Sequence, residues 1–342
     1  MSLLSIRDLS VAFETRDGVV RAVNGVTFSL DAGTVLALLG ESGSGKSVTL
    51  RAILGLHPAG RTRVTGEVLV KGRDVNRLGE RDRERLRGGV VSMVFQEPMT
   101  ALDPVYTIGG QIVETLVQHR GLDHRAASRR ARELLDLVQV PSPERCLASY
   151  PHEISGGMRQ RAMIAIALAG EPELLLADEP TTALDVTVQA QILWLLRDLQ
   201  QQLGLAVIVV THDLGVAAEI ADDAAVMYGG RLVEQAPIRE LFRRPGHPYT
   251  EGLMQATVRR GQKGRPLIPI PGAPPNLALL PAGCAFAPRC PIARDVCLTT
   301  LPLFHSVASG HVARCHLVAE RFADPPATPA TVGSSPTGGE SS

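Results

Sequence analysis

One stretch of the chain has the residue types and spacing of a phosphate-binding loop. It runs Gly40-Glu41-Ser42-Gly43-Ser44-Gly45-Lys46-Ser47, between an apolar run over residues 34–39 and a helix-compatible segment over 48–56. The order strand, glycine loop, helix is the context that such a loop requires. Glycines let backbone N–H groups converge on one point, and the positive end of the following helix aims there too. Lys46 adds a charge for the β- and γ-phosphates, and the Ser47 hydroxyl can hold Mg²⁺. This pattern predicts a nucleoside triphosphate site.

Three later segments place polar side chains directly after short apolar runs. Asp178 and Glu179 follow residues 174–177, His212 follows a run over 206–210, and Gln96 ends a run over 90–95. The carboxyl ends of parallel strands form the mouth of a sheet, where ligands bind. Asp178 fits a magnesium ligand, Glu179 a base that polarises the attacking water, and His212 a contact to the γ-phosphate. Gln96 fits either a contact to Mg²⁺ or the water, or an ordinary polar strand cap, and spacing does not decide between them.

Two further features have both a functional and a structural interpretation. Ser155-Gly156-Gly157 precedes a helix-like run over 162–169 and combines a hydroxyl, free N–H groups and a helix dipole, but the same tripeptide makes ordinary caps. Phe13, near the end of the first predicted strand, could stack on an adenine ring, although spacing alone favours the core. Trp194, the only tryptophan, is expected to pack in the core.

Composition and periodicity indicate the elements that position these residues. The chain has 342 residues, 44% of them hydrophobic, with 35 basic and 35 acidic side chains, so no strong field for nucleic acid is expected. Alternation over 3–13 and 19–30 around Asp17-Gly18 predicts an antiparallel strand pair. Strands alternating with helices further on predict a largely parallel sheet. No signal peptide or run of 18 apolar residues is found, so we expect a cytoplasmic polypeptide without a membrane span.

Together these elements, over residues 3–235, resemble the ATP-binding-cassette family of transport ATPases. The resemblance implies an α/β fold of the P-loop NTPase class, with a mostly parallel core sheet and an N-terminal antiparallel β part. It implies a nucleotide-binding domain over 1–235, whose helical signature subdomain covers about 97–170. One departure from the family pattern is Met158, which stands where the signature usually has glutamine, with Gln160 two residues on.

The resemblance also implies roles for individual residues. In the family the loop at 40–47 is the Walker A motif, Gln96 the Q-loop, Ser155 to Gly157 the signature, Asp185 the D-loop aspartate, and Phe13 falls at the adenine-stacking position. The implied catalytic residues are Lys46, Gln96, Glu179 and His212, and the implied magnesium ligands are Ser47, Gln96 and Asp178. The implied ATP contacts are Phe13, Gly40, Ser42, Gly43, Ser44, Gly45, Lys46, Ser47, Val48, Ser155, Gly156, Gly157 and Asp185.

The family's mechanism implies partners. Two cassettes pack head to tail, and each ATP is held by one subunit's Walker A motif and the other's signature. The expected partners are two transmembrane permease subunits, a second and similar ATPase in a heterodimer, and an extracytoplasmic substrate-binding protein, with no nucleic acid. The chain would then lie at the cytoplasmic face of the cell membrane as a peripheral subunit.

Three segments narrow the resemblance to the dipeptide/oligopeptide permease branch. They are residues 95–104, the variant signature Ser-Gly-Gly-Met-Arg-Gln, and His247-Pro248-Tyr249-Thr250. Import of di- or oligopeptides is therefore expected, with nickel, glutathione or a sugar as alternative cargo. A soluble cassette ATPase acting on nucleic acid or ribosomes is disfavoured by the single cassette and the neutral charge balance.

A cysteine-rich extension is expected over 236–320, followed by a disordered tail over 321–342. Cys284, Cys290, Cys297 and Cys315 are separated by five, six and seventeen residues, among prolines and glycines. Four thiolates suit a [4Fe–4S] cluster or tetrahedral Zn²⁺, and free thiols are a third interpretation. The absence of a close Cys-x₂-Cys pair weakens the zinc interpretation, and the peptide-permease resemblance implies the iron–sulfur cluster. His311 and His316 flank the last cysteine as alternative ligands or hydrogen-bonding neighbours.

Overall fold

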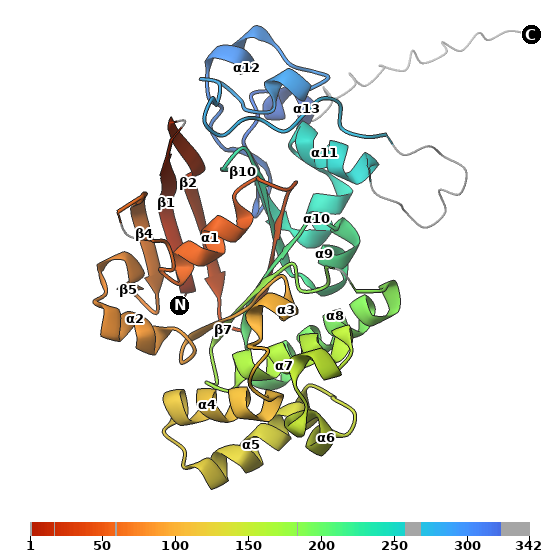
Figure 1. The fold of residues 1–342 in the computed structure, drawn as a ribbon. Helices are drawn as coiled ribbons and strands as arrows, with labels where there is room; N and C mark the ends of the chain where they lie inside the picture. The colour runs from red at the N-terminus through yellow and green to blue at the C-terminus, as the bar shows by residue number, and fades with distance from the viewer. Residues whose placement is uncertain (1, 17, 59, 183, 257–267, 323–342) are drawn as a thin grey trace, which may run out of the picture.

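The computed structural model describes residues 2–16, 18–58, 60–182, 184–256 and 268–322 (Figure 1). The predicted disordered tail lies outside this part of the chain, apart from its first two residues. Among the described residues, no helix is both long enough and apolar enough to cross a membrane.

An antiparallel sheet forms the N-terminal part of the fold, with the order β2-β1-β4-β5. Its strands are β1 (Ser2–Thr15), β2 (Gly18–Asp31), β4 (Thr62–Val70) and β5 (Arg73–Asp74). Thr15 pairs with Gly18, beside the turn predicted at Asp17-Gly18. The antiparallel strand pair predicted from alternation is confirmed, because Leu4, Ile6 and other apolar residues of β1 are buried as the pattern requires.

A second sheet forms the centre of the molecule, with the order β11-β12-β10-β9-β3-β8-β7-β6. Its strands are β3 (Val35–Leu39), β6 (Val91–Val94), β7 (Leu174–Asp178), β8 (Ala206–Thr211), β9 (Asp223–Tyr228), β10 (Arg231–Pro237), β11 (His305–Ala308) and β12 (His311–Ala313). The ladders that connect β9, β3, β8, β7 and β6 are parallel, and β10, β12 and β11 add antiparallel strands at one edge. The mostly parallel core sheet is confirmed, and β9 and β10 form an antiparallel hairpin beside it.

Strand β12 pairs with β10 through Glu234 and Ala313, so residues from the predicted extension complete the central sheet. The predicted division between residues 235 and 236 falls inside β10. Sequence periodicity could not show this pairing, because β11 and β12 are short and lie about seventy residues further along the chain.

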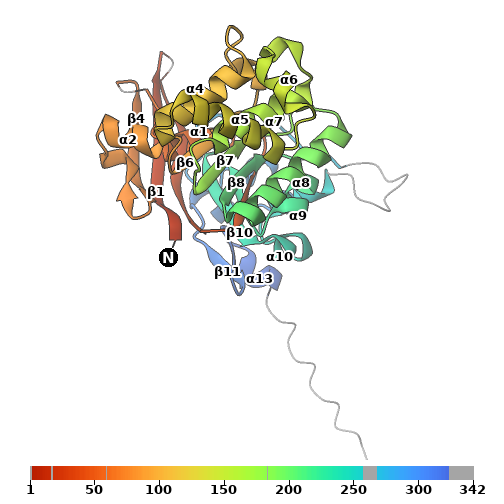
Figure 2. The ribbon, with the colours of Figure 1, turned by 90° about the horizontal axis from the view of Figure 1, so that it is seen from below.

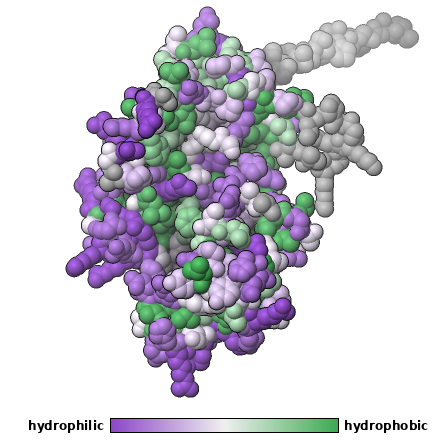
Figure 3. Space-filling view, viewed as in Figure 1, coloured by the Kyte–Doolittle hydropathy of each residue, from purple (hydrophilic) through white to green (hydrophobic). Residues whose placement is uncertain are grey.

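Helices surround both sheets (Figures 1 and 2). They are α1 (Lys46–Ile53), α2 (Glu80–Leu86), α3 (Pro98–Ala101), α4 (Ile108–Arg120), α5 (His124–Leu137), α6 (Pro143–Ala148), α7 (Gly156–Leu168), α8 (Val186–Leu203), α9 (Leu214–Ile220), α10 (Ile238–Arg243), α11 (Pro248–Gln255), α12 (Asp295–Thr299) and α13 (Val318–Phe322), with 3₁₀ turns η1 (Val75–Arg77), η2 (Pro151–Glu153) and η3 (Ala287–Arg289). Helices α4 to α6 gather at the end of the molecule opposite α12, and α3 to α7 correspond to the predicted helical region at 97–170 (Figure 1). Charged side chains cover α2, which is predicted as a solvated helix, and Figure 3 shows this hydrophilic region.

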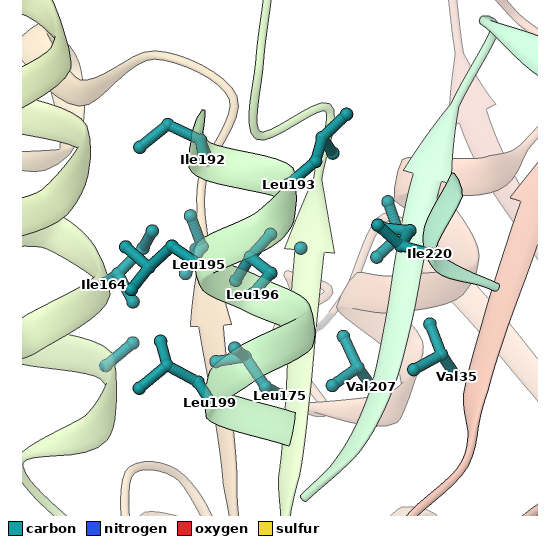
Figure 4. Close-up of a cluster of buried hydrophobic side chains, with 14 of the residues drawn as sticks. Val35, Ile164, Leu175, Ile192, Leu193, Leu195, Leu196, Leu199, Val207 and Ile220 are labelled. Carbon is teal, nitrogen blue, oxygen red and sulfur yellow. The ribbon is translucent and has the colours of Figure 1, made fainter. Parts of the chain in front are cut away.

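The central sheet is buried on both faces. Val35, Ala37 and Leu39 of β3 pack on one side, among the helices, while Leu36 and Leu38 pack on the other, against the antiparallel sheet and α1. On the helical side, α8 lies between α7 and the strands, and Figure 4 shows Leu195, Leu196 and Leu199 in that layer. Burial on two faces is typical of parallel sheets and fixes the strand ends firmly.

The prediction for Trp194 is wrong. Its side chain is 62% exposed, because α8 turns Leu193, Leu195 and Leu196 toward the core and leaves Trp194 on the outer face. The buried stripe of an amphipathic helix covers only part of its circumference, and periodicity alone did not show that Trp194 lies outside this stripe.

Candidate nucleotide site

The glycine loop at residues 40–47 joins the end of β3 to the start of α1. Gly40 and Gly45 have φ angles of 148° and 104°, where a side chain is strongly disfavoured. A Cβ at Gly40 would collide with the carbonyl oxygen of Met227, and one at Gly45 with that of Ala22. The loop therefore lies directly against neighbouring backbone, and free N–H groups at the start of α1 face its concave side.

Lys46 is a buried cation inside this loop, with 5% of its surface exposed. Its Nζ donates hydrogen bonds to the carbonyl oxygens of Gly40 and Glu41, at 2.8 and 2.9 Å. Burial lowers the pKa of Lys46, and the carboxylates of Glu179 and Asp178 act in the opposite direction. The ammonium is thus held by the loop itself and faces the acidic pair, which is where a bound phosphate would need a positive charge.

Asp178 is the last residue of β7 and lies against the loop. The Ser47 Oγ donates a hydrogen bond of 2.9 Å to its Oδ1. Burial raises the pKa of Asp178, and the bond from Ser47 opposes that rise. Two of the three predicted magnesium ligands, Ser47 and Asp178, are therefore neighbours, and a hydroxyl beside a carboxylate is an oxygen donor set that suits Mg²⁺.

Glu179 has a φ of 45°, an uncommon conformation for a residue with a side chain. Its Oε2 accepts hydrogen bonds from Thr182 Oγ1 at 2.9 Å and Gln96 Nε2 at 3.1 Å, and His212 Nδ1 lies 3.4 Å from Oε1. Strands β6, β7 and β8 are parallel neighbours, so the residues that follow them meet at one sheet edge. The structure thus brings together Gln96, Glu179 and His212 as the sequence predicted. Thr182 was missed, although a threonine three residues after the acid is a signal that could have been noticed.

The signature residues form a separate group at the starts of α7 and α8. Ser155 caps α7 by accepting a hydrogen bond of 3.3 Å from the N–H of Met158, and Asp185 caps α8 in the same way. Gly156 and Gly157 lie against Leu184 and Val188. In the part of the chain that the structure describes, no hydrogen bond joins Ser155 to the loop at 40–47. The predicted nucleotide contacts therefore fall into two groups on one chain.

Phe13 is half-buried beside the helix that follows the loop. Its ring meets that of His57 edge to face, with centroids 5.7 Å apart, and His57 lies 3.0 Å from the carbonyl oxygen of Val48. Phe13 also packs against the core on the β side. Both interpretations of Phe13 remain compatible with this position, because one face of a ring can pack while the other meets a ligand.

The four cysteines of the C-terminal region are free thiols that influence one another. The Cys284 N–H donates to the Cys297 carbonyl oxygen at 2.8 Å, and burial raises the pKa of Cys284 to about 11, with smaller contributions from Cys315, Cys290 and Cys297. Among the described residues, however, no group of three or more His, Cys, Asp or Glu side chains is arranged to hold a metal ion. The geometry therefore does not support the predicted cluster.

The two flanking histidines have partners elsewhere. His311 Nε2 lies 2.7 Å from Glu234 Oε1, in a pair with no solvent exposure, and His316 Nε2 lies 2.9 Å from the carbonyl oxygen of Thr300. Both histidines bond to groups other than a cysteine, so their expected role beside the last cysteine stays a prediction.

Comparison with known proteins identifies the family. The family model described as "ABC transporter" matches residues 23–182, and that described as "Oligopeptide/dipeptide transporter, C-terminal region" matches residues 233–297. A protein of Sinorhizobium fredii named as a probable peptide ABC transporter ATP-binding protein is 51% identical over 316 residues, which cover 92% of this chain and 94% of that protein. The oligopeptide transport ATP-binding protein OppD of Mycobacterium tuberculosis is 50% identical over 92% of this chain, which spans only 51% of that longer protein.

A solved structure agrees with these matches. It is a dimeric ATP-binding cassette in a post-hydrolysis state with ADP and Pi, with a TM-score of 0.62 and 28% identity, covering 69% of this chain and 99% of the other. The chain belongs to the ATP-hydrolysing subunits of ABC transporters, in the branch that carries the oligopeptide/dipeptide C-terminal region.

Proposed function

We propose that this ATPase powers an importer for di- or oligopeptides. The observation that carries this proposal is the match of residues 233–297 to the C-terminal region of oligopeptide/dipeptide transporters. Strand β10, which overlaps this match, belongs to the central sheet and pairs there with β9 and β12, so the region belongs to the same folded unit as the cassette. We place a nucleotide-binding domain at 1–235 and the extension at 236–320. The ladder between β10 and β12 connects the two.

The residues at the sheet edge would divide the work of hydrolysis. Lys46 and the loop N–H groups would hold the β- and γ-phosphates, and Ser47 and Asp178 would hold Mg²⁺, together with Gln96. Glu179 would orient and deprotonate the attacking water, while His212 would contact the γ-phosphate. The hydrogen bonds that converge on Glu179 from Thr182 and Gln96 support this arrangement, because a base must be held in one orientation.

The signature residues would contact a different ATP molecule from the one that the loop at 40–47 binds. Ser155, Gly156 and Gly157 lie with Asp185 at the starts of α7 and α8, and none of their hydrogen bonds reaches the loop at 40–47. A separate anion-binding helix start is what a head-to-tail pair of cassettes needs, since each ATP is then held by both subunits. We propose a second, similar ATPase as the partner.

Transmembrane permeases would dock on the segment that follows Gln96. Met99, Val105 and Tyr106 in this segment are exposed by 49%, 71% and 58%. Exposed apolar side chains gathered in one segment are typical of interaction sites. Two permeases, an extracytoplasmic substrate-binding protein and a peripheral position at the cytoplasmic face of the membrane complete the proposal, with no nucleic-acid partner.

For the cysteines we propose a [4Fe–4S] cluster, with Zn²⁺ as the alternative. The donor set supports it rather than the arrangement of the side chains: four thiols come from the same proline-rich region, and the Cys284 N–H donates to the Cys297 carbonyl oxygen. A cluster would supply cross-links between Cys284, Cys290, Cys297 and Cys315 in a region with little core of its own. Iron and sulfide assays on anaerobically purified protein test this, and bound zinc without iron would overturn it.

Uptake by a deletion strain tests the cargo. Without this gene, accumulation of labelled di- and oligopeptides should fall to background, and the wild-type chain should restore it. Labelled nickel, glutathione and sugars serve as parallel probes. Unchanged peptide uptake together with lost uptake of one of these other compounds would contradict the peptide assignment.

A further inference from the structure

Arg289 of the C-terminal region reaches across the molecule to the phosphate-binding loop. Its side chain is 5% exposed, and it forms a bidentate ion pair with Glu41: one terminal nitrogen lies 2.7 Å from Oε2 and the other 3.1 Å from Oε1. These residues are 248 positions apart in the chain. Paired N–H donors on one carboxylate fix both direction and distance, which a single ion pair does not.

Other bonds hold the guanidinium in place. Its Nε donates to the carbonyl oxygen of Pro271 at 2.8 Å, and one terminal nitrogen lies 3.2 Å from the Tyr228 hydroxyl. Arg289 ends the turn η3 and directly precedes Cys290. A buried arginine whose donors are all directed at fixed partners loses little orientation and keeps its charge at any accessible pH.

Glu41 is held at its backbone as well as at its side chain. Its N–H donates to the Tyr249 hydroxyl at 2.8 Å, and its carbonyl oxygen accepts from Lys46 Nζ at 2.9 Å. The rings of Tyr228, Tyr249 and Phe286 pack together behind this contact. A continuous path of bonds therefore runs from Arg289 through Glu41 to Lys46, the cation that faces the phosphates.

A second segment of the C-terminal region lies on the same loop. A cavity of about 290 Å³ separates Ser42 and Gly43 from Pro274 and Asn276. Leu277 contributes its carbonyl oxygen to a hydrogen bond with the Arg21 N–H at 3.4 Å. The region thus borders the loop at a second place across this cavity, and among the described residues the ionic contact to the loop comes from Arg289.

We propose that Arg289 is a positioning residue of the ATP site. By holding Glu41 it keeps the loop in the shape that receives phosphates, so the C-terminal region sets the affinity of its own cassette for ATP. Arg289 does not touch the nucleotide and acts only through Glu41. This inference rests on the ATPase activity of the family and is independent of the cargo.

The test measures binding and turnover separately. In the full-length protein, Arg289→Gln should raise the dissociation constant for MgATP by about tenfold or more, because the loop loses the bidentate pair that holds Glu41. The kcat at saturating ATP should stay within about twofold, because the groups around Glu179 are untouched. The dissociation constant of Arg289→Lys should lie between those of the wild type and Arg289→Gln, since lysine restores the charge without the bidentate geometry.

Arg294 offers a matched control. It lies in the same region and pairs with both oxygens of Glu320, at 2.7 Å each, but that pair is exposed and remote from the loop. Arg294→Gln should leave the affinity for MgATP unchanged. If Arg294→Gln and Arg289→Gln weaken binding equally, the effect is general loosening of the region and the proposal fails.

A variant on the loop side covers the case in which Arg289→Gln folds poorly, and a double-mutant cycle tests the coupling where both single variants fold. Glu41→Gln keeps the size of the side chain and removes the charge from the loop side of the pair. The double variant Glu41→Gln, Arg289→Gln should bind MgATP no more weakly than the worse single variant. Additive losses, or wild-type affinity in both folded single variants, would overturn the proposal. Absence of ATP hydrolysis in the wild-type protein would instead contradict the assignment of the nucleotide site, not the role of Arg289.

Discussion

At the scale of residues, the site combines a cation held by the loop with two acids at the end of one strand. Lys46, Ser47, Asp178 and Glu179 were all predictable, because each belongs to a short motif whose chemistry depends on local order. Arg289 was not predictable in the same way. Its partner Glu41 is 248 positions away, and nothing in the sequence around either residue signals the other.

Lys46→Ala tests the loop. Removing the ammonium leaves the carbonyl oxygens of Gly40 and Glu41 without their donor and the phosphates without a counter-charge. We expect the dissociation constant for MgATP to rise by about one to two orders of magnitude, from the loss of charged hydrogen bonds. Titration with a fluorescent ATP analogue measures it. Binding as tight as in the wild type would contradict the role of Lys46.

At the scale of elements, the C-terminal region is anchored by a buried polar cluster. Glu234 of β10 accepts hydrogen bonds from the N–H groups of Gly246 and His247, at 2.5 and 2.9 Å, and it pairs with His311 of β12. His247 Nδ1 accepts from the Tyr249 N–H at 3.1 Å and so caps α11. The motif His247-Pro248-Tyr249 was noted in the sequence, but not the buried acid it packs beside, because that acid belongs to another element.

The cap that His247 forms on α11 leads to a prediction about how stability depends on pH. Burial lowers the pKa of His247 from 6.5 to about 4, so the unfolded chain takes up a proton at a higher pH than the folded one. Stability should therefore be full above pH 6.5 and fall as the pH drops from 6.5 toward 4, by on the order of 3 kcal/mol in total. Urea unfolding at a series of pH values measures the loss.

His247→Asn should remove much of that pH dependence, because asparagine can cap the helix without titrating. His305→Gln is the control, since His305 is an exposed residue of β11 in the same region. Equal acid sensitivity in the wild type and in His247→Asn would contradict the prediction.

At the scale of the whole molecule, the proposed nucleotide contacts lie in two separate groups. The antiparallel strand pair and the parallel sheet followed from periodicity, whereas the P-loop fold class and the helical region followed from the resemblance to the family. The addition of β11 and β12 to the central sheet did not, because short strands far along the chain leave no periodic signal. The exposure of Trp194 was also missed, since an amphipathic pattern alone did not identify the buried face.

Ser155→Arg tests whether the signature residues and the loop at 40–47 contact different ATP molecules. A bulky cation at the start of α7 should block the partner's ATP from this surface without disturbing the loop at 40–47. We expect MgATP binding by the isolated chain to stay within about twofold of wild type, while ATP turnover by the assembled transporter drops at least about tenfold. A chain that loses its own ATP binding on this change would show that Ser155 belongs to the same half-site.

The central claim is that Glu179-assisted hydrolysis in this chain drives peptide movement, and one measurement tests it most directly. The transporter, reconstituted in proteoliposomes with either the wild-type chain or Glu179→Gln, is assayed for ATP turnover and labelled-peptide transport in the same preparation. We predict that Glu179→Gln retains bound ATP but loses turnover by about two to four orders of magnitude, and loses transport with it. Turnover and peptide transport near wild-type rates in Glu179→Gln would contradict the account.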